Sequence, residues 1–199
     1  MHFAGLVLTI QWIWKQIVRG YHQLMSNLDY PRMNYTLVGV SHICHEFATA
    51  LGPDEVEGDK HGNKGCLYKF GHFDVSMLDT SGCSILSQIK KKESVIYVIY
   101  QEDQFSLQQS QLVELFQCTK DDALKVIAVV IIRGPDPNNK SHPVRMDYDE
   151  NVQERLEKRA RQLKESGEIP ADVGYRFFSV ERNSMRQYEE VLTWVRLEL

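Results

Sequence analysis

Apolar runs and amphipathic runs alternate along the chain from residue 34 to the C-terminus. The two longest apolar runs, "SVIYVIY" at 94–100 and "KVIAVVII" at 125–132, are rich in β-branched residues and have no alternating polar positions. Strands of this kind lie in the centre of a sheet that helices cover on both faces. Two further buried strands are predicted, "YTLVGV" at 35–40 and "YRFFSV" at 175–180.

A β-hairpin is predicted between the first strand and the central ones. The runs "CLYKF" at 66–70 and "FDVSML" at 73–78 are separated only by Gly71 and His72. A two-residue connection that contains glycine favours a tight antiparallel turn. The stretch before it, Gly52 to Gly65, is rich in glycine and charge, so we expect a mobile loop there.

Helical patterns separate and follow the strands. They cover 106–118, 147–167 and 184–199, and Gly167 supplies a C-terminal cap for the charged second helix. Alternating strands and helices predict a three-layer α/β fold with a mostly parallel, six-stranded sheet. Ligands of such folds bind at the carboxyl ends of the strands, so the residues there decide the function.

The first 20 residues differ from the rest of the chain. At helical spacing their apolar side chains share one broad face, so an amphipathic helix is predicted over 1–20, followed by a linker over 21–33 and the α/β domain over 34–199. The apolar face consists of Phe3, Leu6, Val7, Ile10, Ile13, Trp14, Ile17 and Val18.

This helix is predicted to be an anchor. Its apolar stretch is shorter than the roughly 20 residues that span a bilayer, so spanning is the second choice. Docking on a membrane surface and docking in a groove of a partner protein both remain open. We expect a membrane-associated protein on the cytoplasmic face. Because no acidic residue occurs before Asp29, a mitochondrial inner membrane complex is the alternative.

Composition limits the possible chemistry. The 199 residues carry a net charge of -4, which argues against a nucleic-acid-binding protein. The four cysteines form no CxxC pair, so no zinc ribbon or disulfide framework is indicated. His42, Cys44 and His45 could approach Asp79 or Cys83 as a zinc shell. Adjacent residues seldom converge on one ion, so we expect no metal site.

Short motifs recur at the expected strand ends. In chain order they are "TLVGV", "MLDTSG", "VIYVIYQED", "VVIIRGPD" and "FFSVE". Their order and spacing resemble the Ras superfamily of small GTPases, and the amphipathic helix leading into the first strand resembles its Arf-like branch. The resemblance implies a P-loop type fold. Its nucleotide site would be degenerate and would comprise Gly39, Cys44, His45, Glu46, Asp79, Gly82, Asp136 and Ser179.

The phosphate loop of that family has the pattern G-x-x-x-x-G-K-[ST]. Only Gly39 is kept, because Cys44, His45 and Glu46 stand where the second glycine, the lysine and the hydroxyl residue belong. A carboxylate 4 Å from a phosphate charge costs on the order of 4 kcal/mol at an effective dielectric of 20. The resemblance therefore implies a site that repels a triphosphate.

The same resemblance predicts the local path of the chain. The turn after Val40 should follow the course of a phosphate loop without enclosing a phosphate, and a short helix should begin near His45 and end after Leu51. Glu46 should turn toward solvent or pair with a cation such as His42 or His45, because an unpaired buried carboxylate is costly.

The magnesium and hydrolysis motifs are incomplete. "DTSG" keeps Asp79 and Gly82, but Cys83 follows where the family has the glutamine that orients water. No serine or threonine between Thr49 and Ser76 can close a first switch over magnesium.

The guanine-binding motifs are also altered. "RGPD" keeps Asp136 of N-K-x-D but has Arg133 and Gly134 at its first two positions. "SVE" keeps Ser179 of S-A-K but replaces the lysine with Glu181.

These changes predict a pseudo-GTPase: a domain without enzymatic activity or cofactor that acts as a membrane-associated binding module or structural subunit of a protein complex. The alternative is an Arf-like switch that binds GTP or GDP through Asp79, Asp136 and Ser179. A resemblance to the membrane-tethered β subunit of the signal-recognition-particle receptor would imply an intact nucleotide site, which this sequence lacks. A different doubly wound α/β fold also remains open.

Overall fold

The fold is described from a computed structural model. The described residues are 13, 16–17, 33–58, 66–70, 73–79, 89, 92–101, 105–117, 119, 124–133 and 152–199. Several residues singled out from the sequence lie outside them, namely Phe3, Leu6, Val7, Ile10, Trp14, Val18, Gly82, Cys83 and Asp136.

The strands that the structure describes form one seven-stranded sheet at the centre of the domain, in the order β2-β3-β4-β1-β5-β6-β7. From β4 to β7 all neighbours pair in parallel, whereas β2 and β3 are antiparallel at one edge. The strands are β1 (Met33–Gly39), β2 (Glu55–Glu57), β3 (Leu67–Lys69), β4 (Phe73–Asp79), β5 (Ser94–Tyr100), β6 (Val126–Arg133) and β7 (Gly174–Glu181).

The prediction of six strands was wrong by one. The extra strand, β2, lies inside the stretch that was expected to be a loop, and it pairs with β3. Val56 packs against the core, while Glu55 and Glu57 both contact Lys69 of the neighbouring strand. These cross-strand contacts, rather than any local pattern of three residues, stabilise the strand. The predicted hairpin is confirmed by the antiparallel pairing of β3 with β4.

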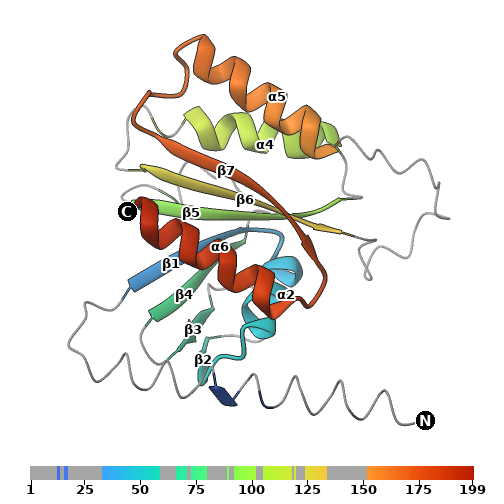
Figure 1. The fold of residues 1–199 in the computed structure, drawn as a ribbon, viewed down its shortest axis with the longest axis vertical. Helices are drawn as coiled ribbons and strands as arrows, with labels where there is room; N and C mark the ends of the chain where they lie inside the picture. Colours follow the sequence, from blue (N-terminus) through green and yellow to red (C-terminus); the bar gives the residue numbers. More distant parts are fainter. Residues whose placement is uncertain are drawn as a thin grey trace, which may run out of the picture.

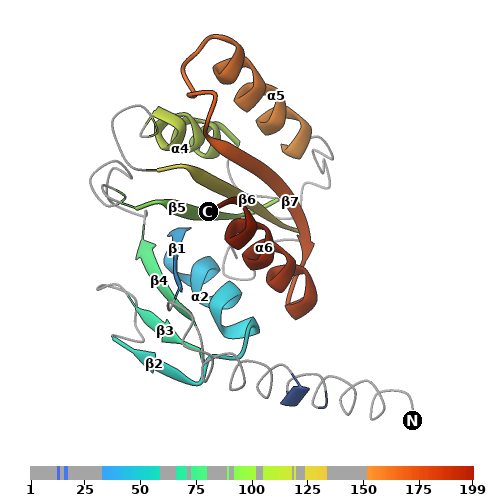
Figure 2. The same cartoon turned by 60° about the vertical axis from the view of Figure 1, so that its left-hand side comes forward.

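Helices cover both faces of the sheet, which confirms the three-layer prediction. Figures 1 and 2 show α4 and α5 on one face and α2 and α6 on the other. The helices of the described chain are α2 (Ser41–Ala50), α4 (Phe105–Gln117), α5 (Val152–Glu165) and α6 (Met185–Glu198).

Two apolar cores result, one on each side of the sheet. The central strands β5 and β6 supply both, because successive side chains of a strand point to opposite faces. In β6, Val130 faces the α2 and α6 side, whereas Val129 faces the α4 and α5 side, and neither is exposed. This explains why the two long apolar runs were recognisable as central strands.

Of the predicted N-terminal helix, only residues 13, 16 and 17 are described. All three are helical, and Ile13 and Ile17 are 46% and 57% exposed. The helix over 1–20 stays a prediction. No helix in the described part of the chain combines the length and apolar character needed to cross a membrane.

Candidate functional site

The connection from β1 to α2 is the first feature of the carboxyl edge of the sheet. Only Val40 separates the two elements, and the N–H groups of Ile43 and Cys44 donate to the Val40 carbonyl at 3.0 and 3.1 Å. In a phosphate loop, the peptide N–H groups of these positions surround the phosphates. The predicted path was therefore wrong, because the helix begins at Ser41 instead of near His45. Its predicted end is confirmed, since Leu51 caps it.

Gly39 has a structural reason to be glycine. Its φ is +156°, and a Cβ placed on it would lie 2.5 Å from the Val98 carbonyl oxygen and 3.2 Å from the Cys44 Sγ. The backbone of β1 thus approaches that of β5 more closely than any side chain permits. Cys44 is fully buried over this point. The glycine that the family motif shares with this chain is explained here by packing alone.

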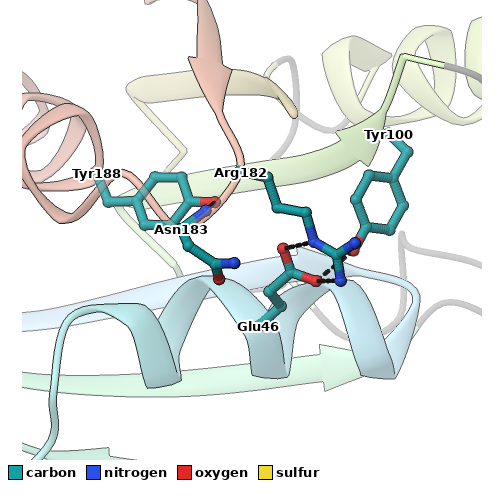
Figure 3. Close-up of polar contacts among 5 residues, drawn as sticks. All are labelled: Glu46, Tyr100, Arg182, Asn183 and Tyr188. Atoms are coloured by element: carbon teal, nitrogen blue, oxygen red, sulfur yellow. Dashed lines mark hydrogen bonds and ion pairs between the residues drawn. The ribbon is translucent and has the colours of Figure 1, made fainter. Parts of the chain in front are cut away.

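Glu46 of α2 is held by side chains from two other parts of the chain. Figure 3 shows its carboxylate facing the guanidinium of Arg182 and the hydroxyl of Tyr100. Arg182 donates from Nε to Oε1 at 2.8 Å and from Nη2 to Oε2 at 2.9 Å, and the Tyr100 hydroxyl donates to Oε2 at 2.5 Å. The hydrogen bond to Glu46 raises the pKa of Arg182. Pairing of Glu46 with a cation is confirmed.

The predicted partners of Glu46 were wrong, because both histidines have other contacts. His45 places Nδ1 2.5 Å from the hydroxyl of Tyr68, and His42 stacks on the ring of Tyr100 with centroids 6.2 Å apart. Burial raises the pKa of Tyr68. Within the described ranges, no three His, Cys, Asp or Glu side chains are grouped so that they could hold a metal ion.

The turn between β7 and α6 positions Arg182. Asn183 has a φ of +60°, a left-handed conformation that asparagine tolerates better than most residues. Its N–H donates to the hydroxyl of Tyr188 at 3.2 Å, and the Glu181 N–H donates to Gln187 Oε1 at 2.5 Å. Tyr188 is fully buried, and burial raises its pKa to about 12. Contacts with Gln187 and Tyr188 of α6 therefore hold the turn in the conformation from which Arg182 contacts Glu46.

A second arginine pair lies at the ends of β6 and β7. Arg133 donates from Nε to Ser179 Oγ at 2.7 Å and from Nη1 to Glu181 Oε1 at 2.9 Å. The side chains of Arg133 and Glu181 are 55% and 57% exposed. These three residues occupy the positions that the resemblance assigns to guanine recognition, and Arg133 contacts the other two.

Part of the predicted site is brought together at this edge. Gly39 and Asp79 are register partners at the ends of β1 and β4, and Ser179 lies near the end of β7. Sequence reasoning missed Tyr100, Arg182 and Asn183. The only local signal was an asparagine just before the last helix, a residue type that often adopts left-handed turns.

Comparisons with known proteins identify the fold. No protein-family model and no curated protein sequence matches the chain. Among solved structures, it is similar to the Arl6 BBS3 small GTPase from Trypanosoma brucei, solved with the nucleotide analogue GppNp. The TM-score is 0.54 at 9% identity, covering 83% of this chain and 96% of that one. A putative nucleolar GTP-binding protein 1 from Plasmodium falciparum gives 0.49 at 11% identity, covering 85% and 87%. The chain therefore has a small-GTPase fold.

Proposed function

We infer that this chain is a GTPase-fold domain that neither binds nor hydrolyses GTP and serves as a binding module or structural subunit of a larger protein assembly. The start of α2 is the observation that carries the proposal. With one residue between β1 and α2, and with the Ile43 and Cys44 N–H groups bonded to Val40, no loop remains to surround a phosphate. A fold of this kind can be kept as a platform when its chemistry is lost.

The charges along the edge support the same proposal. Glu46 places a carboxylate where the family has a hydroxyl residue for magnesium, and it uses Arg182 for its own neutralisation. Glu181 likewise uses Arg133. Cations that could have attracted a nucleotide are thus committed to carboxylates of the same chain.

The proposed anchor is the helix over 1–20, which would hold the domain at a membrane on its cytoplasmic face or in a mitochondrial inner membrane complex. Ile13 and Ile17 are separated by one helical turn and are both exposed. Exposed apolar side chains at this spacing suit a membrane surface or a groove in a partner protein.

An Arf-like switch that uses GTP or GDP is the alternative. The placement of Gly39 and Asp79 at neighbouring strand ends favours it, as does the similarity to a small GTPase solved with a nucleotide analogue. A switch, however, needs contacts to the γ-phosphate and magnesium that hold its loops.

Hydrolysis of GTP separates the two functions. Purified full-length protein with GTP and magnesium should release phosphate no faster than GTP alone, and the Asp79→Ala variant should behave identically. A magnesium-dependent turnover that Asp79→Ala abolishes would refute the proposal and establish the switch.

The anchor has its own test. The Ile13→Asp, Ile17→Asp double variant should leave the membrane or complex fraction of a cell lysate, while the midpoint of chemical unfolding should not change because both side chains are exposed. Removal of residues 1–20 should have the same effect. Unchanged fractionation of both variants would exclude this role of the helix.

A further inference from the structure

We propose that Glu46, Tyr100 and Arg182, here called the clamp, form an internal tie that fixes α2 to the β7–α6 turn and holds the carboxyl edge of the sheet in one conformation without a bound ligand. The clamp does not rest on the proposed function, because it concerns the coupling of two parts of the chain. As a consequence, α2 and the β7–α6 turn should move together.

The three residues come from three separate parts of the fold. Glu46 lies in the middle of α2, Tyr100 ends β5, and Arg182 follows β7. Glu46 and Arg182 are separated by 136 residues. Figure 3 shows the three side chains converging between α2, the end of β5 and the turn before α6. One carboxylate therefore joins α2 to the end of β5 and to the β7–α6 turn.

Burial makes this contact energetically important. The Glu46 side chain is 15% exposed and that of Arg182 is 39% exposed, and Tyr100 is fully buried. The carboxylate accepts three hydrogen bonds, two of them from a bidentate guanidinium. Bidentate arginine pairs are directional as well as strong. Loss of Arg182 would leave a largely buried carboxylate with one neutral donor, which is costly.

The backbone next to Arg182 is held by contacts that do not involve the clamp. The left-handed φ of Asn183 and its N–H bond to Tyr188 fix the backbone next to Arg182. Less backbone entropy is lost on pairing when the backbone beside the donor is already ordered. Movement of α2 relative to the β7–α6 turn would have to break both arginine hydrogen bonds, and movement of α2 relative to β5 would break the tyrosine hydrogen bond. The clamp thus acts as a conformational lock at the edge where ligands of this fold class bind.

A double-mutant cycle tests the clamp. Unfolding by urea is measured for Glu46→Gln, Arg182→Gln and the double variant. Each single variant should lower the folding equilibrium constant by about tenfold or more, and the double variant should recover about tenfold of the combined loss, because the partner is no longer left unpaired. The matched control is the exposed pair Arg186 and Glu190 on α6, at 3.2 Å. The double-mutant cycle of this exposed pair should give a coupling factor of less than about two in the folding equilibrium constant.

Hydrogen exchange supplies the second readout. Arg182→Gln should reduce amide protection in both α2 and the first turn of α6, whereas Arg186→Gln should leave α2 unchanged. If Arg182→Gln fails to fold, Arg182→Lys keeps the charge without the bidentate fork and should lie between wild type and Arg182→Gln in unfolding midpoint. The proposal would be overturned if the Glu46–Arg182 cycle gave a coupling factor of less than about two in the folding equilibrium constant. Loss of amide protection confined to α6 would overturn it as well.

Discussion

Two arginine–carboxylate pairs occur at the carboxyl edge of one sheet, and their surroundings differ. In the Glu46–Arg182 pair the carboxylate is largely buried, accepts a bidentate guanidinium and is supported by the hydroxyl of Tyr100. The Arg133–Glu181 pair joins register partners on β6 and β7, and both of its side chains are more than half exposed. Solvent screens the second pair, whereas the first would leave a buried charge if it were broken.

The two pairs are therefore expected to contribute differently to the stability of the fold, which their positions in the sequence motifs do not indicate. Glu46 and the Arg133–Glu181 pair occupy positions that the resemblance to small GTPases assigns to nucleotide contacts, so the motifs alone give the two carboxylates equal importance. What distinguishes the two carboxylates is how far each is exposed to solvent. Glu46 is enclosed between α2, β5 and the β7–α6 turn, while Glu181 projects from the end of an edge strand. The following predictions test this contrast, beginning with the largest expected effect.

Gly39→Ala should have the largest effect, because it disrupts the packing of β1 on β5 next to the start of α2. The added Cβ would lie 2.5 Å from a backbone oxygen in a conformation that is already unfavourable for alanine. We expect a loss of about 4 kcal/mol in the free energy of unfolding, or failure to fold. Gly167→Ala is the control, because its φ is +74° but no atom lies within 4 Å of the added Cβ. It should cost only about 1 kcal/mol, and equal losses would contradict the packing argument.

Alkaline pH should destabilise the apolar core on the α2 and α6 side of the sheet, which contains Tyr35 and Tyr188. Burial raises the pKa of both Tyr35 and Tyr188 to about 12. Because the folded-state values exceed the unfolded value of 10.0, the stabilisation is complete below pH 10 and is lost as pH rises from 10 toward 12. The two tyrosines together should cost about 3 kcal/mol by pH 11. Urea unfolding across this range measures the loss, and Tyr188→Phe should make the decline less steep. A flat profile would contradict the burial of both hydroxyls.

Arg182→Gln and Arg133→Gln compare the two pairs directly. The first should lower the free energy of unfolding by about 2 kcal/mol, since it leaves Glu46 largely buried without its cation. The second should cost less than about 0.5 kcal/mol because Glu181 can be solvated. Similar values for the two variants in urea unfolding would remove the distinction between the pairs.

Asn183 variants should give the smallest effects. Asn183→Gly keeps the left-handed φ of +60° and should change the free energy of unfolding by less than about 0.5 kcal/mol. Asn183→Ala disfavours that conformation and should cost about 1 kcal/mol. A larger loss for glycine than for alanine, measured by thermal unfolding, would argue against the turn geometry as the feature that orients Arg182.

The layers of the fold could be predicted from sequence because they depend on local patterns. The central strands are continuous apolar runs, and the hairpin follows from its two-residue connection. The strand Glu55–Glu57 could not be found, since three residues give no recognisable period. Its stability comes from Val56 in the core and from Lys69 on the next strand.

The site was less predictable for a different reason. Aligning residues with a phosphate-loop motif assumes the conformation of that loop, whereas Ser41 already begins the helix. The sequence did carry one signal, because no glycine occurs between Gly39 and Gly52 to maintain a loop. The partner of Glu46 could not be inferred at all. Arg182 is 136 residues away, and no local pattern encodes so distant a contact.

Equilibrium binding of guanine nucleotide tests the central claim most directly. Full-length protein is purified without added nucleotide, its extract is analysed for GTP and GDP, and it is then titrated with each nucleotide in the presence of magnesium. Because α2 begins immediately after Val40 and Glu46 is paired internally, we predict no co-purified nucleotide and no saturable heat of binding. One equivalent of bound GDP or GTP, lost on removal of magnesium, would contradict the account.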